Sequence, residues 1–138
     1  MPFASRFDCH VRVVFSRAEG LLTYEDLMAE RPRILGHPSY EPDFKQLIDL
    51  RAVGGIAIST DEVRELARSD PFAAGSLRAV VVPTDHSFGL ARVYELSHAS
   101  SDYVRAFRCM EDARRWLGLD PEHEPVADDP CHTDGSCP

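Results

Sequence analysis

Apolar residues recur in two alternating patterns over the first 119 positions of the chain. Short β-branched or continuous apolar runs, such as "VRVVF" and "AVVV", are typical of strands. Between these runs, apolar residues recur three or four positions apart, as on one face of a helix. Strands and helices are therefore predicted to alternate, at about residues 9–16, 22–35, 45–53, 59–72, 76–84, 85–100, 103–109 and 110–119.

Turn and cap residues mark where these elements begin and end. Thr23 and Asp26 form the capping pattern of a helix start, and Pro32 predicts that this helix ends or kinks near Arg31. "AEG" at residues 18–20 is read as a turn, and "GGIAI" at residues 54–58 as a turn with a short extended step.

Strands that alternate with helices favour parallel pairing through right-handed crossovers. The four apolar residues from Ala79 to Val82 fit a parallel strand that is buried on both faces. We expect an α/β domain over residues 1–119, with a mostly parallel sheet of four to five strands and about four helices. Residues 120–138 are acidic, rich in proline and poor in large apolar groups, so they are predicted to be a disordered tail.

The charge distribution limits the classes of partner. The formal net charge is −8, and much of it lies in the tail, whereas the body is nearly neutral. Nucleic acid and anionic membranes need a basic face, so neither is expected as a partner, although an arginine patch on the body stays open. No apolar run approaches the length of about 20 residues that spans a bilayer, and the N-terminus lacks a secretion-signal pattern, so we expect a cytoplasmic protein.

The four cysteines are read as free thiols rather than as a disulfide framework. Cys9 and Cys109 fall in strand-like stretches, where cysteine is often a small buried apolar residue. Cys131, His132 and Cys137 in the tail are all capable of binding metal, but the spacing of the two cysteines is wider than in common zinc sites and a fourth ligand is not evident. We therefore predict no metal and no cofactor, and read the tail as solvated or as disulfide-bonded under oxidation.

Three stretches taken together, "FKQLIDLRAVGGIAIST", "RAVVVPTDHSFGLARVYE" and "VRAFRCMEDARRWLGL", resemble the bacterial SpoIIAA-like (STAS/SEC14-type) family of small uncharacterised proteins. The resemblance covers roughly residues 7–119 and implies a β-α superhelix with no established catalytic activity. Related SEC14-type domains bind lipids, but they are longer, and their lipid-gating helix has no evident counterpart in this sequence.

The wider group includes anti-sigma-factor antagonists, in which a serine at a helix start is phosphorylated by a partner kinase and controls partner binding. Ser59 falls near that position, but this chain has "AISTDEV" where the antagonists have an Asp-Ser-Ser-Gly-like run. Ser59 or Thr60 before two acidic residues is also what a helix N-terminus requires. A phosphate there would meet the charges of Asp61 and Glu62, so capping is favoured over phosphorylation.

Polar side chains follow two of the predicted strands. Asp49 and Arg51 end one strand, while Thr84, Asp85 and His86 follow another. Ligands collect beyond the carboxyl ends of strands in open α/β sheets. These five residues, with Ser59 and Thr60, are therefore the predicted rim of a ligand or partner site.

We expect a non-enzymatic, STAS-like binding or regulatory module whose rim binds an unknown protein partner or small ligand. One alternative is a small enzyme that uses Asp85 and His86 in acid–base chemistry. Against it, Asp85 or Ser87 could simply cap the next helix while His86 is solvated. Another is a carrier of a lipid or other apolar ligand, which would need a dry apolar cavity beneath the helix that carries Phe88 and Leu96. Without such a cavity these two residues are read as core. A homodimer fits a domain of this size.

Overall fold

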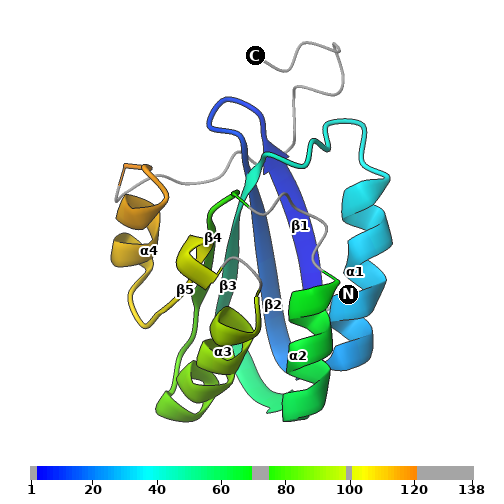
Figure 1. The fold of residues 1–138 in the computed structure, drawn as a ribbon, viewed down its shortest axis with the longest axis vertical. Coiled ribbons are helices and arrows are strands. Elements are labelled where there is room, and N and C mark those ends of the chain that lie inside the picture. The colour runs from blue at the N-terminus through cyan, green and yellow to red at the C-terminus, as the bar shows by residue number, and fades with distance from the viewer. Residues whose placement is uncertain (1–2, 70–74, 99–100, 121–138) are drawn as a thin grey trace.

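The computed structural model describes residues 3–69, 75–98 and 101–120. These residues form one five-stranded sheet with the strand order β1-β2-β3-β4-β5 (Figure 1). β1 is antiparallel to β2, and the remaining neighbours pair in parallel, which confirms the mostly parallel sheet predicted from the sequence. The strands are β1 (Phe3–Asp8), β2 (Val13–Thr23), β3 (Lys45–Ala57), β4 (Arg78–Val81) and β5 (Val104–Phe107).

The helices lie on both faces of this sheet. They are α1 (Tyr24–Leu35), α2 (Thr60–Arg68), α3 (Asp85–Ser97) and α4 (Met110–Trp116), with a 3-10 turn η1 (Ser101–Tyr103) before β5. Successive residues of a strand point to opposite faces. Ile48 and Leu50 accordingly pack in the core beneath α1, α2 and α3, whereas Leu47 packs in the core beneath α4. Figure 1 shows α4 apart from the other three helices.

The first strand of the fold is absent from the sequence prediction. The predicted strand at residues 9–16 is instead a turn followed by the start of β2. The Asp8 carboxylate accepts hydrogen bonds from the backbone N–H groups of His10 and Val11 at 3.1 and 3.4 Å, which closes the turn between β1 and β2. β1 has few apolar residues, but Phe3, Ser5 and Phe7 share one face of it, with both phenylalanines buried.

Two predicted turns lie inside strands. β2 continues through "AEG" to Thr23, and β3 continues through Gly54 and Gly55 to Ala57. Gly20 adopts a φ of 70°, and the β2–β3 register shifts beside it, so this glycine serves a bulge in the strand. The β2–β3 pair therefore extends well beyond β4, whose pairing with β3 ends at Asp49.

The structure also decides the predicted end of the first helix and the predicted burial of two residues of α3. α1 continues through Pro32 to Leu35, so the predicted end near Arg31 is wrong; Ile34 in this last turn is buried. Leu96 is 65% exposed and is not a core residue, whereas Phe88 packs against the core.

Cys9 is buried and disulfide-bonded, so the prediction of a free thiol is wrong there. Cys109 is free and exposed, at the start of α4. None of the described helices combines the length and the apolar character needed to cross a bilayer.

Candidate functional site

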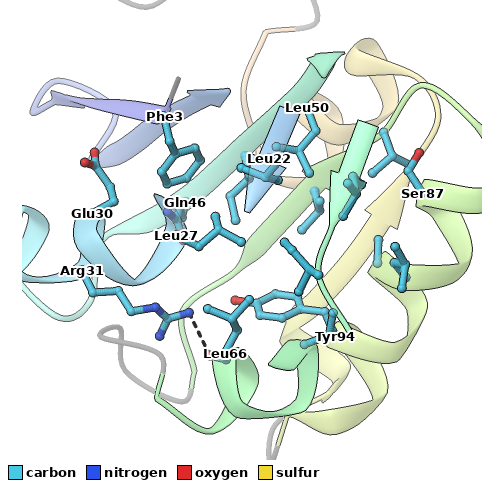
Figure 2. A pocket seen from close by; sticks show the side chains of 18 of the residues that line it. Phe3, Leu22, Leu27, Glu30, Arg31, Gln46, Leu50, Leu66, Ser87 and Tyr94 are labelled. Carbon is cyan, nitrogen blue, oxygen red and sulfur yellow. Dashed lines mark hydrogen bonds between the residues drawn. The ribbon is translucent and has the colours of Figure 1, made fainter. Parts of the chain in front are cut away.

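A cavity of about 100 Å³ lies between the sheet and the three helices α1, α2 and α3 (Figure 2). Its lining is mainly apolar. Ile48 and Leu50 of β3 line it from the sheet, and one residue from each helix, Leu27, Leu66 and Ala91, faces them. This is the apolar cavity, and it lies where the sequence alternative of an apolar-ligand carrier requires one.

The elements that surround the apolar cavity follow from local sequence. α2 carries Val63, Leu66 and Ala67 on one buried face and is polar elsewhere, so this face packs inward. The extension of β3 brings Ile56 toward the cavity, and Ile58 follows it. Because both isoleucines are only partly buried, they lie at the opening of the cavity rather than at its base.

Arg31 connects α1 to the last turn of α2 beside the cavity. Its Nη2 atom donates to the Leu66 carbonyl oxygen at 2.8 Å, and its Nη1 atom donates to Ser69 Oγ at 3.2 Å and to the Ser69 carbonyl oxygen. Carbonyl groups at a helix C-terminus lack partners within the helix and carry partial negative charge. Arg31 therefore caps the C-terminal end of α2 from a neighbouring helix.

The end of the apolar cavity near β1 is polar. Gln46 Nε2 donates to Ser16 Oγ at 3.0 Å, Ser16 Oγ lies 2.7 Å from Ser5 Oγ, and Ser5 is hydrogen-bonded to the Glu30 carboxyl group. If Ser5 donates to Glu30, its oxygen accepts from Ser16, so all donors in this chain run toward the carboxylate. Figure 2 shows the Glu30 carboxyl group near Phe3.

Glu30 is buried although it is acidic, with an exposed fraction of 3%. Burial raises the pKa of its carboxyl group above the ordinary value, while the hydrogen bond from Ser5 and the charge of Arg33 act in the opposite direction. Arg33 Nη1 lies 3.8 Å from Glu30 Oε1, which is too far for a hydrogen bond. Among the described residues, Oε1 has no hydrogen-bond partner.

A second cavity of about 160 Å³ lies between β1 and α1, and we call it the β1–α1 cavity. Ser5, Arg33 and His37 line it, and Glu30 and Ile34 line both this cavity and the apolar one. The Glu30 side chain therefore lies in the wall between the two cavities.

Comparison with protein-family models found no match, and neither did comparison with curated proteins. Among solved structures, the chain is similar to an uncharacterised protein of the DUF3478 family from Shewanella loihica PV-4, which is described as having a SpoIIAA-like fold. The two chains are 20% identical, the TM-score is 0.53, and the match covers 76% of this chain and 83% of the other. The chain has a SpoIIAA-like fold. This confirms the resemblance found in the sequence at the level of fold.

The predicted rim residues are spread over the SpoIIAA-like fold. Asp49 alternates with Ile48 and so lies on the α4 face of the sheet, opposite the apolar cavity. Its carboxylate accepts hydrogen bonds from Arg51 Nε at 2.9 Å and from the Arg51 backbone N–H at 3.0 Å. Burial opposes ionisation of Asp49, but these hydrogen bonds and the charges of Arg51 and Arg17 outweigh it, so the pKa is lowered.

Ser59 and Thr60 lie at the start of α2, beyond the extension of β3. Ser59 is the N-cap: its Oγ accepts from the Glu62 backbone N–H at 3.1 Å, and Glu62 Oε1 accepts from the Ser59 backbone N–H at 2.9 Å. The predicted helix cap is confirmed. Both hydroxyl residues are exposed, and their phosphorylation stays a prediction.

Thr84, Asp85 and His86 lie at the start of α3. Thr84 is the N-cap and forms a capping box with Ser87, so Thr84 fills the cap position that was predicted for Asp85 or Ser87. Asp85 forms an ion pair with Arg108, and His86 is exposed.

The metal-capable tail residues Cys131, His132 and Cys137 lie outside the described residues. Within the described ranges, no three histidine, cysteine or acidic side chains come together as a metal site.

Sequence reasoning missed Glu30, Arg31 and Gln46 as site residues. A signal was present for Glu30, because it follows Leu27 by three positions and precedes Ile34 by four, which places an acid on the buried face of α1. Arg31 and Gln46 gave no such signal. Their roles depend on where α2 and β2 pack against them.

Proposed function

We propose that this protein is a non-catalytic binding module that holds an apolar small molecule, or the apolar end of a larger one, in the apolar cavity. The observation that carries the proposal is a largely apolar cavity that three helices and the sheet line and that opens to the surface. Small-molecule sites are typically concave and apolar, with a few polar groups that orient the ligand. Glu30 and Gln46 would be such groups at one end of this cavity.

The size of the cavity limits what can be enclosed. A dry cavity of about 150 Å³ holds benzene, and the apolar cavity is smaller, at about 100 Å³. It suits several carbons of a chain, with the rest of the ligand lying against Ile56 and Ile58 at the opening. Each methylene group buried contributes about 0.8 kcal/mol, or roughly a fourfold gain in affinity.

The alternatives have weaker support. An enzyme built on Asp85 and His86 would need them beside a cavity, whereas neither lines the apolar one, and Asp85 pairs with Arg108. A regulatory switch at Ser59 would break the hydrogen bond from the Glu62 backbone N–H. It would affect the cavity only through α2.

The test measures the affinity of the protein for linear alcohols from 1-butanol to 1-decanol by isothermal titration calorimetry. Affinity should rise roughly fourfold per carbon and then level off when the cavity is full. Ala91 is buried and lines the cavity. Ala91→Leu, which places three added carbons there, should weaken binding at least about tenfold.

Ala29→Leu makes the same change at an exposed position of α1 and serves as the control. Circular dichroism should show that both variants are folded. If the wild-type protein binds the longer alcohols no better than Ala91→Leu does, the proposal is wrong.

A further inference from the structure

The unsatisfied oxygen of Glu30 is the feature that the apolar-ligand proposal leaves unexplained. A buried carboxylate that lacks full pairing is costly, and structures normally supply it with hydrogen-bond donors. Here the chain from Gln46 through Ser16 and Ser5 supplies one, and Oε1 has none among the described residues.

The position of Glu30 places its side chain beside two cavities, and although Oε1 itself is buried, a rotation of the carboxyl group would turn it toward a ligand in either one. Glu30 lines the apolar cavity and also the β1–α1 cavity. A molecule that lies in the apolar cavity with its polar end toward β1 therefore ends at this carboxyl group, which Figure 2 shows near Phe3 at one side of the lining.

The charges nearby determine which polar end is favoured. Arg33 is the cation closest to Oε1, but it lies 3.8 Å away and its side chain is 55% exposed, so solvent screens it. A cationic donor from a ligand could approach more closely and form a charge-assisted hydrogen bond, which is about twice as strong as a neutral one. An anionic end would be repelled by Glu30.

We propose that the ligand of the apolar cavity carries a primary amine, and that the ammonium group of this amine binds Glu30 Oε1 while the alkyl chain fills the cavity. The inference rests on the proposed function and adds a chemical class to it. An alkylammonium is a compact cation, and one of its three N–H groups would donate to Oε1 in the wall between the two cavities.

The test compares three probes of equal chain length, hexylamine, 1-hexanol and hexanoate, by calorimetry at neutral pH, where the amine is cationic. Wild-type protein should bind hexylamine at least about tenfold more tightly than 1-hexanol, and hexanoate most weakly. Glu30→Gln should abolish the preference for the amine and leave the affinity for 1-hexanol within about twofold. Glu25→Gln, at an exposed position of the same helix, should leave the preference unchanged.

The outcomes separate failure of amine recognition from failure of the proposed function. If hexylamine and 1-hexanol bind equally, or hexanoate binds best, recognition of an amine by Glu30 is wrong and the apolar-ligand function stands. If the amine preference persists in Glu30→Gln, Glu30 is not the recognising group. If none of the three probes binds, both proposals fail. The comparison in wild-type protein needs no variant, so it remains decisive even if Glu30→Gln does not fold.

Discussion

Arg31 joins α1 to the last turn of α2, and its replacement by methionine tests how much this connection contributes. Methionine keeps an apolar stem against the cavity and removes the donors to Leu66 and Ser69. A shielded hydrogen bond from a charged group contributes roughly 1.5–3 kcal/mol. The partly buried bond to the Leu66 carbonyl oxygen belongs at the lower end of this range. The exposed contacts with Ser69 add about 0.5 kcal/mol together.

The expected loss is therefore about 2 kcal/mol in the free energy of unfolding, measured by urea denaturation. In a domain of this size the loss lowers Tm by roughly 6–12 °C. Arg64→Met is the matched control, since among the described residues Arg64 forms only an exposed pair with Asp61 on α2. It should change stability by less than about 0.5 kcal/mol. If Arg31→Met loses no more than Arg64→Met, Arg31 does not secure α2.

Three further predictions concern individual side chains. Because the folded pKa of Glu30 is raised above 4.5, the unfolding free energy of wild type falls as pH rises from the unfolded to the folded pKa. Glu30→Gln should therefore gain stability relative to wild type through this window, and a gap that does not change with pH would contradict the assignment. Ser59→Ala should cost about 1 kcal/mol in denaturant unfolding through loss of the N-cap, whereas Ser59→Asp should cost much less; equal losses would argue against capping. The folded pKa of Asp49 is lowered below 3.8, so its pairing with Arg51 stabilises the protein above that pH and loses its effect as pH falls through the folded pKa. Asp49→Asn should be less stable than wild type at neutral pH, with the gap closing in acid, and an undiminished gap at the lowest pH would contradict this.

The parts of the fold that local pattern determines could be predicted from the sequence. The alternation of strands and helices after residue 45 follows from hydrophobic periodicity, and the helix starts at Thr23 and Ser59 follow from cap chemistry. Each of these signals is local, because it involves only residues a few positions apart in the chain. The apolar run at residues 79–82 likewise identified β4 as a strand that is buried on both faces.

The parts that depend on tertiary contacts could not be predicted in this way. Gly20, Gly54 and Gly55 resemble turn residues locally, but the pairing of β2 with β3 keeps Gly54 and Gly55 within β3 and places Gly20 at a bulge inside β2. β1 has too few apolar residues to stand out, and it is defined by its pairing with β2. The cavity itself arises where α1, α2 and α3 approach the sheet, and no motif in the sequence encodes that meeting point.

The short length of α2 has a further consequence. A helix of nine residues is not stable alone in water, so its order depends on Val63 and Leu66 packing at the cavity wall and on the contacts of Arg31. A ligand in the apolar cavity would add contacts to that face and raise the free energy of local unfolding of α2. Ser59 is the N-cap of the same helix, so loss of this cap and ligand occupancy would shift one local unfolding equilibrium in opposite directions. Amide hydrogen exchange in α2 would report this coupling without any change in the average structure.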